Sequence, residues 1–380
     1  MSPLNPLFAL VVLLLALAVT AALQWKVKFS GEAGRFESID GLRGFLAISV
    51  FIHHANIWYS YLQTGAWEAP VSNLFNQLGA TGVTFFFMIS SFLFVNRLLA
   101  TRETGMNWKR FFVKRFYRLF PLHAILVVLI FLIILWQGNW ELRDSITTLV
   151  LKFAKWLGFG VVGLDFVNGS NAYLVNAGVL WSLPYEWLLY FSLPLAALVF
   201  HKKRPAIWFV LAGVAFIVLS GTQVKYLPEH FISFTGGAIA PFVMRLNLSR
   251  FEVNHPLVSV VVLGAIASIF FFHGPNNAFC KALIILAFTG IALGNKVFGL
   301  LKWKVLKLLG EMSYSTYLIH GIVIFLAVHW VVGFETAKGL SETEFGLFVL
   351  ALVPVVVGVS YLAYRWIEKP FMERARRKYQ

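Results

Sequence analysis

The chain has 380 residues, of which 59% are hydrophobic and only 13% are charged. Soluble domains carry roughly 25% charged residues, so this composition excludes a soluble globular enzyme and indicates a polytopic membrane protein. The formal net charge of +15 does not by itself indicate a nucleic-acid partner, because lysine and arginine also accumulate on the cytoplasmic side of membrane proteins. The single cysteine, Cys280, excludes an internal disulfide framework and a cysteine-ligated metal cluster.

Eleven segments approach the length of about 20 apolar residues that a helix needs to cross the hydrocarbon core of a bilayer. They are predicted as helices at 7–25, 42–62, 79–99, 119–136, 179–200, 206–221, 230–245, 256–273, 278–295, 313–332 and 345–366. Positive charges follow the first apolar run instead of preceding it, which favours an uncleaved span over a signal peptide. The sequence therefore predicts an all-α fold, a polytopic transmembrane helical bundle.

The long outer loop 137–178 contains one further apolar stretch, at 146–164. Two lysines, Lys152 and Lys155, interrupt this stretch. Charged groups at the centre of a span are costly. We therefore expect an interfacial or re-entrant segment here.

The positions of the basic residues test the predicted spans. If the loops alternate between the two sides of the membrane, lysine and arginine should concentrate on the inner side. Of the 32 basic residues, six fall on the other side and leave 26 on the inner side; the six are Arg143, Lys152, Lys155, Lys225, Lys281 and Lys338. This segregation predicts an N-terminus outside the cell and a C-terminus in the cytoplasm.

Ionisable side chains within spans are functional hypotheses by default, because burying them in lipid is costly. Glu186 is the one carboxylate placed deep within a predicted span. Arg43 and His54 are eleven residues apart, which is about three turns and about 16 Å along one helix face. The depths of His54 and Glu186 match if their helices are neighbours. We therefore favour functional roles for these two residues.

The other polar groups leave alternatives open. His53 points about 100° away from His54, so a packing or backbone contact is expected for it. His329 lies near the outer interface, and His320 is equally compatible with a site and with a structural role. Asp40 is interpreted either as a helix N-cap or as a partner of Arg43 three residues further on.

The segment 107–118 interleaves basic and aromatic residues. One interpretation is an interfacial helix that touches anionic lipid. The other is a phosphate site, in which Arg115 and Arg118 share a helix face and grip a polyanion. A nucleic-acid partner is disfavoured because basic residues occur in all the inner loops. No metal-ligand spacing or phosphate-binding loop is present in the sequence.

Six short motifs, in order, resemble those of the acyltransferase 3 family of membrane O-acyltransferases. They are 39–44 together with His54, 82–92, 114–121, 181–186, 314–320 and 364–371. Ser91 stands where the family usually has glycine, and Lys114 replaces an arginine. The resemblance implies an extra N-terminal helix and linker at 1–35, a ten-span core at 36–373 and a basic cytoplasmic tail at 374–380, as a stand-alone member without a soluble domain.

The resemblance implies transfer of an acyl group from cytoplasmic acyl-CoA, with acetyl as the default, to a hydroxyl of a carbohydrate or cell-surface glycan outside. We expect His54 to be the general base and Glu186 to orient it. An acyl-histidine intermediate is the alternative route. Expected donor-binding residues are Arg43, Arg115, Arg118 and His320, and expected supporting residues are Asp40, Ser90, Trp181, Ser182, Tyr185 and Tyr317.

Acyl-CoA is expected to be a substrate, with no permanently bound cofactor and no metal. The other expected partners are the glycan acceptor and membrane lipid, and the oligomeric state is left open. The resemblance places the chain in a bacterial inner membrane. Three alternatives remain at this stage: a secondary transporter or flippase with a His/Glu proton relay, a structural or lipid-binding membrane protein, and N-acylation of an amine.

Overall fold

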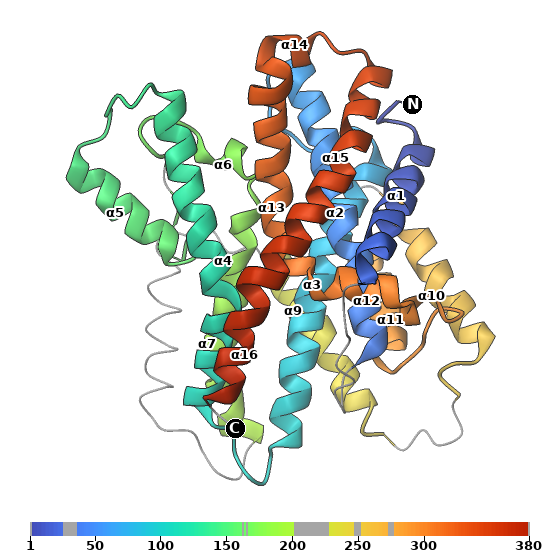
Figure 1. Ribbon diagram of the computed structural model, residues 1–380. Helices are drawn as coiled ribbons and strands as arrows, with labels where there is room; N and C mark the ends of the chain where they lie inside the picture. The colour runs from blue at the N-terminus through green and yellow to red at the C-terminus, as the bar shows by residue number, and fades with distance from the viewer. Residues whose placement is uncertain are drawn as a thin grey trace. The chain divides into compact units, whose positions relative to one another are not determined.

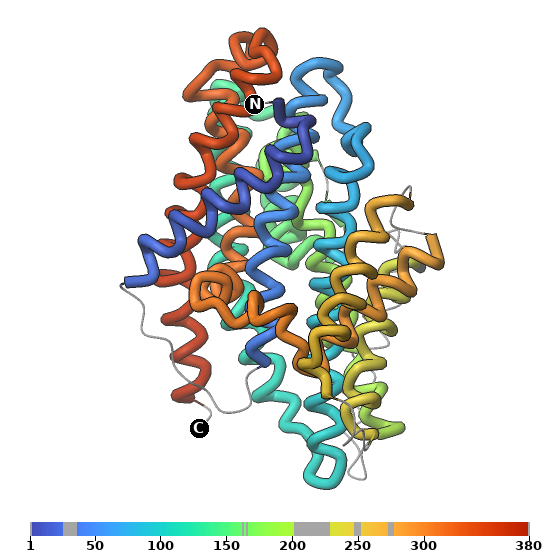
Figure 2. The backbone as a smooth tube through the Cα atoms, turned by 90° about the vertical axis from the view of Figure 1, so that its right-hand side faces the viewer, coloured from blue at the N-terminus to red at the C-terminus, as the bar shows by residue number. Residues whose placement is uncertain are grey.

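The computed structural model describes residues 2–25, 36–161, 163–164, 166–200, 228–246, 252–272 and 277–378. These residues form helices joined by turns and loops, as the ribbon and the tube show (Figure 1, Figure 2). They contain no strand, only an isolated bridge between Val167 and Ser170. The predicted all-α fold class is confirmed.

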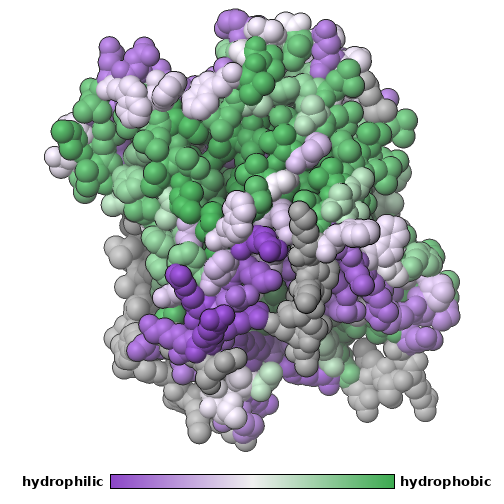
Figure 3. Space-filling model, in the orientation of Figure 1, coloured by the Kyte–Doolittle hydropathy of each residue, from purple (hydrophilic) through white to green (hydrophobic). Residues whose placement is uncertain are grey.

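Among the described residues, six helical segments are long and apolar enough to cross a membrane. They are α1 (Pro6–Gln24), α3 (Asn73–Ala100), α4 (Trp108–Gln137), η1 with α7 (Val179–Phe200), α13 through α14 (Ser313–Lys338) and α15 through α16 (Glu342–Arg377). Hydrophobic residues also cover much of the visible surface, as expected for helices in contact with lipid (Figure 3). The chain is an integral membrane protein.

The remaining helices are α2 (Glu37–Thr64), α9 (Pro228–Val243), α10 (Pro256–Ile269) and α11 (Ala278–Ala292), with shorter connecting elements. Every predicted span within the described residues coincides with a helix or a run of helices. The predicted span at 206–221 lies outside the described residues. The helices divide into two compact units, and each unit is described by itself.

The first unit comprises Met1–Phe92 and Phe231–Tyr361. At its centre α2 packs against α13 (Ser313–Leu326), η2 (Leu300–Lys302) and the short helix α12 (Lys304–Glu311). Both ribbon and tube show α12 lying across α2 (Figure 1, Figure 2). Glycines make this close crossing possible: a Cβ at Gly41 would collide with the carbonyl of Leu301, and one at Gly310 with the carbonyl of Asp40.

The N-cap interpretation of Asp40 is wrong. Helix α2 begins at Glu37, five residues before the apolar run, and Phe36 occupies the N-cap position. Asp40 is therefore a buried residue in the first turn of the helix. A carboxylate there is favourable, because backbone N–H groups in the first turn lack partners and carry partial positive charge.

The second unit comprises Leu93–His230 and Leu362–Gln380. Helix α4 is continuous over 30 residues and passes through Pro121. It packs against α16 (Lys369–Arg377) and against η4 (Tyr364–Glu368). In the long loop, α5 (Ile146–Leu157) has 12 residues, and Ser145 caps it by accepting a hydrogen bond from the Thr148 N–H. A helix of about 18 Å is too short for a hydrocarbon core of about 30 Å.

Candidate active site

Two histidines from different helices of the first unit meet side by side. His54 of α2 and His320 of α13 approach so that His54 Nδ1 lies 3.0 Å from His320 Nε2. Their ring centroids are 5.0 Å apart. His320 is fully buried, whereas His54 is half-buried. The pair therefore joins a fully buried imidazole to one on a residue that is less buried.

The hydrogen bonds of the pair determine the tautomer of each ring. His320 Nδ1 lies 2.9 Å from the Thr316 carbonyl, which accepts only, so Nδ1 carries the proton and donates. His320 Nε2 is then an acceptor. His54 Nδ1 faces this nitrogen and, at 3.1 Å, the Val50 carbonyl. Both neighbours accept, so His54 Nδ1 carries the proton, and the basic lone pair of neutral His54 is on Nε2.

Aromatic and backbone groups surround the histidine pair within the same unit. Phe51 and Tyr317 each place a ring centroid 6.3 Å from that of His320. His53 turns away, and its Nδ1 lies 2.9 Å from the Phe75 carbonyl, which is the backbone contact expected from the sequence. An apolar surrounding disfavours the charged form of an imidazole, so His54 and His320 are best described as neutral in the resting protein.

The second unit contains a separate polar cluster. The Tyr190 hydroxyl donates a hydrogen bond to Glu186 Oε1, one helical turn away on α7. The Arg115 guanidinium interacts electrostatically with both residues and lies 5.2 Å from the centre of the Phe94 ring. Arg118 also interacts electrostatically with Tyr190. The cluster holds two arginines and one carboxylate, which leaves net positive charge for an anionic ligand.

The predicted supporting residues are divided between the units. In the second unit, Trp181 and Tyr185 both place their ring centroids 4.9 Å from that of His230. The Ser182 hydroxyl donates to the Val179 carbonyl at 3.2 Å, so its proton is engaged within its own turn. In the first unit, Ser90 is half-buried on α3.

The predicted donor residue Arg43 lies in the first unit, half-buried on α2. Glu186 and His54 belong to different units, so the proposed orientation of His54 by Glu186 stays a prediction.

Two contacts of the candidate site residues were not predicted. The contact between Glu186 and Tyr190 could have been predicted from the sequence, because residues four apart share a helix face and Tyr190 follows Glu186 by that spacing. The contact between His54 and His320 could not be predicted from the sequence, because it depends on which face of α13 packs against α2. Among the residues that the structure describes, no three His, Cys, Asp or Glu side chains form a group that could hold a metal ion.

A small cavity of about 230 Å³ lies in the long loop of the second unit. Three aromatic residues and two asparagines contribute to its lining, which consists of Trp156, Leu164, Phe166, Asn171, Ala172, Tyr173, Asn176 and Gly178. Gly178 is followed directly by η1 and by α7, which carries Glu186. The chain that lines the cavity therefore continues directly into the helix that carries Glu186 and Tyr190.

Comparison with known proteins identifies related chains over most of the length. A family model described as an acyltransferase domain matches residues 36–365. The acyltransferase MdmB of Streptomyces mycarofaciens is 26% identical over 90% of this chain and 93% of its own length. Nodulation protein 10 of Rhizobium leguminosarum is 25% identical over 90% of this chain and 95% of its own.

A third relative is considerably longer than this chain. The peptidoglycan O-acetyltransferase OatA of Listeria monocytogenes is 26% identical over 88% of this chain, but the match covers only 55% of OatA. This chain thus spans about half the length of that relative. No solved structure gives a significant match.

Proposed function

This chain belongs to the acyltransferase family, and from that premise we propose that it moves an acyl group, by default acetyl, from cytoplasmic acyl-CoA to a hydroxyl of a carbohydrate or cell-surface glycan outside. The observation that carries the proposal is the hydrogen-bonded histidine pair, whose contacts leave the lone pair of half-buried His54 on Nε2. One of the named relatives is a peptidoglycan O-acetyltransferase, which favours O-acylation over N-acylation.

In the proposed reaction, His54 Nε2 removes the proton of the acceptor hydroxyl as the oxygen attacks the carbonyl carbon of the thioester. A new C–O bond forms and the C–S bond breaks. The proton on the imidazolium then passes to the leaving thiolate, which departs as coenzyme A. The protein returns to its starting protonation state, so atoms and charges balance within one turnover.

His320 supports this role through its position. When His54 gains a proton, its Nδ1–H group still faces the lone pair of His320 Nε2. A hydrogen bond to a charged group is stronger than one to a neutral group, so this contact favours the imidazolium as it forms. We assign His320 as a positioning residue, in preference to the donor-binding role expected from the sequence.

The acyl-CoA donor carries several phosphate groups, and the guanidinium groups of arginine side chains are suited to bind them. Arg115 and Arg118 on α4 bring two guanidinium groups to the cluster around Glu186 and Tyr190. Guanidinium forks bind phosphate oxygens in pairs. In the first unit, Arg43 lies on α2 below His54 along the helix and is the proposed contact for the pantetheine end. The proposed orientation is a cytoplasmic C-terminus and an N-terminus outside, in a bacterial inner membrane.

The acceptor is proposed to bind at the outer loop of the second unit. Its cavity of about 230 Å³ presents Tyr173, Asn171 and Asn176 together with aromatic rings. Ligand sites typically combine an apolar wall with a few polar groups that fix orientation. Side-chain amides and a phenol are suited to hydrogen bonding with sugar hydroxyls.

The test is acyl transfer from radiolabelled acetyl-CoA by the purified protein to an isolated cell-wall glycan. His54→Ala is expected to abolish transfer, whereas His329→Ala is the matched control and keeps it, because His329 contacts Trp58, Phe325 and Phe334, none of which is assigned to the reaction. Wild-type transfer by His54→Ala refutes the proposed base. Label held covalently by the wild-type protein favours the acyl-histidine route, and proton-coupled uptake into vesicles without any acyl product favours the transporter.

A further inference from the structure

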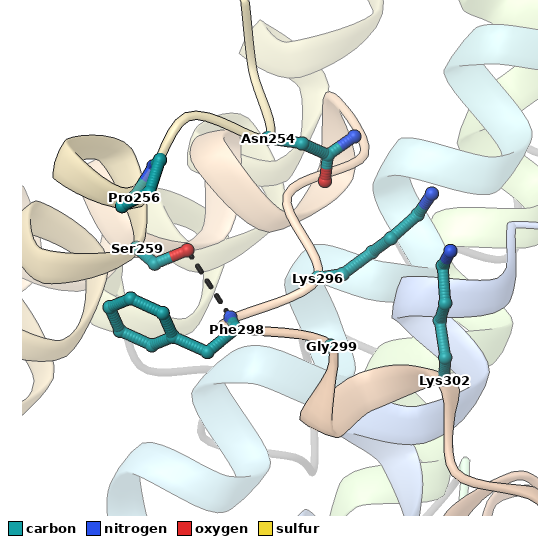
Figure 4. A pocket seen from close by; sticks show the side chains of 7 residues that line it. All are labelled: Asn254, Pro256, Ser259, Lys296, Phe298, Gly299 and Lys302. Atoms are coloured by element: carbon teal, nitrogen blue, oxygen red, sulfur yellow. Dashed lines mark hydrogen bonds between the residues drawn. The ribbon is translucent and has the colours of Figure 1, made fainter.

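A cavity of about 350 Å³ lies in the first unit, away from the histidine pair. It is formed where the N-terminal end of α10 meets the loop between α11 and η2, and it is lined by Asn254, Pro256, Ser259, Lys296, Phe298, Gly299 and Lys302 (Figure 4). None of the residues assigned to acyl transfer contributes to this lining. The cavity therefore needs its own explanation.

Hydrogen bonds hold the wall of this cavity in a defined shape. Asn295 Nδ2 donates to the Val253 carbonyl at 2.7 Å, and Asn295 Oδ1 accepts from the Val297 N–H at 2.9 Å. The Ser259 hydroxyl donates to the same Asn295 oxygen at 3.2 Å and accepts from the Phe298 N–H at 3.3 Å. Buried Asn295 thus fixes both sides of the cavity.

The loop backbone is held in a conformation that side chains disfavour. Val297 has φ 47° and Phe298 has φ 54°, and both are followed by Gly299 at φ 87°. Positive φ is unfavourable for a β-branched or bulky residue and persists only where the surroundings enforce it. Such strain is common at ligand sites, and here it lies between the two lysines of the cavity.

Positive charge converges on the cavity. Lys296 and Lys302 extend to the same side of it (Figure 4), and the adjacent Lys302 ammonium lowers the pKa of Lys296 below its ordinary value. The Glu37 carboxylate is 2.6 Å from the Lys307 Nζ, and Lys302 and Lys296 also interact with it electrostatically. Pro256, at the first position of the 14-residue helix α10, adds the positive end of the helix dipole.

Exposed apolar groups flank this charged cavity. Phe298 is 63% exposed and Trp303 is 55% exposed, while the outer face of α10 presents Leu257, Val260 and Val261. Aromatic residues beside lysines are typical of the membrane–water interface, where the apolar surface contacts acyl chains and the ammonium groups contact headgroups. A ligand in this cavity would therefore lie beside two ammonium groups and beside the exposed apolar side chains of α10.

We propose that Lys296 and Lys302 bind a phosphate group in this cavity, and the exposed apolar flank favours the headgroup of an anionic phospholipid as its carrier. A phosphate neutralises the two ammonium groups that otherwise repel each other, and it accepts hydrogen bonds from both. The same chemistry would be presented by a phosphate of soluble coenzyme A. The proposal does not depend on the proposed acyl transfer, because no residue of that reaction takes part.

The test measures binding of two probes to the full-length protein in neutral detergent: phosphatidylglycerol in mixed micelles, with phosphatidylcholine as the reference, and coenzyme A in solution. The double variant Lys296→Gln/Lys302→Gln is expected to bind phosphatidylglycerol roughly 30-fold more weakly, since each lysine at an anionic surface contributes on the order of 1 kcal/mol. The variant Lys296→Arg/Lys302→Arg keeps both positive charges and is expected to retain binding of phosphatidylglycerol.

Lys304→Gln is the matched control, because Lys304 is exposed, lies two residues from Lys302 and does not line the cavity. Weakened binding in the phosphatidylglycerol experiment alone supports a membrane lipid as the ligand, and weakened binding in the coenzyme A experiment alone supports the soluble phosphate. Equal affinities of wild type and double variant for both probes overturn the proposal. It is also overturned if Lys304→Gln weakens binding as much as the double variant Lys296→Gln/Lys302→Gln.

Discussion

Replacing His320 tests the histidine pair most directly. In the proposed reaction, His54 becomes charged while its Nδ1–H group donates to His320 Nε2 over 3.0 Å. A hydrogen bond to a charged partner contributes about 1.5–3 kcal/mol, and 1.4 kcal/mol corresponds to about a factor of ten. His320→Ala is therefore expected to lower kcat for acyl transfer by about 10- to 100-fold.

The assay separates two roles for the same residue. Initial rates of transfer, measured while acetyl-CoA and acceptor are varied in turn, give kcat and both KM values for wild type and variant. A positioning role lowers kcat and leaves the donor KM close to that of wild type. A donor-binding role, as expected from the sequence, raises the donor KM with little change in kcat. That second pattern would refute the positioning role of His320.

A second variant, His320→Gln, distinguishes loss of the hydrogen bond from loss of folding. His320 is fully buried, so truncation to alanine also removes packing contacts. His320→Gln keeps a hydrogen-bond acceptor and more of the volume, and it is expected to retain more activity than His320→Ala. If both variants are equally inactive while their melting temperatures match that of wild type, hydrogen bonding to His54 does not explain the effect.

Three further predictions concern other parts of the chain. Gly310→Ala is expected to destabilise the protein by about 1–3 kcal/mol in thermal unfolding, because the new Cβ meets the Asp40 carbonyl, whereas Gly358→Ala has open space and is expected to be neutral or stabilising. Lys152 lowers the pKa of Asp144, so this pair stabilises the long loop above the ordinary pKa of the carboxyl, and the stabilisation is lost as the pH falls through the lowered value. The protection factors of the loop amides between pH 6 and 3 should show this loss. Lys152→Ala should reduce the pH dependence, and the hydrogen bond from the Asn168 N–H to Asp144 should account for what remains. Arg118→Ala is expected to raise the KM for acyl-CoA with a smaller effect on kcat, and an unchanged donor dependence would remove this residue from the donor site.

The helices were predictable because bilayer length and hydropathy dominate their sequence pattern. The predicted span at 345–366, for example, coincides with α15 and the π-helical η4. Boundaries were less predictable at polar helix ends. The first turn of α2 contains Glu37 and Asp40, and their low hydropathy left them out of the predicted span. They are nevertheless helical, because α2 packs against α12.

The candidate site was only partly predictable for a related reason. Cost of burial identified His54 and Glu186 as residues of interest, since that argument needs only the depth of each residue. Their partners depend on which helix faces meet. His320 was recognised as a buried histidine, but its contact with His54 requires α13 to pack on α2.

The neutral histidine pair has a consequence for energy coupling. Two adjacent imidazoles that share a single hydrogen bond in an apolar surrounding have room for one extra proton, and a second would place two positive charges about 3.0 Å apart. The proton taken from the alcohol must leave with the thiol before the next cycle begins. Turnover of that kind moves no net charge through the pair, so collapsing the membrane potential with an ionophore should leave the chemical step unchanged.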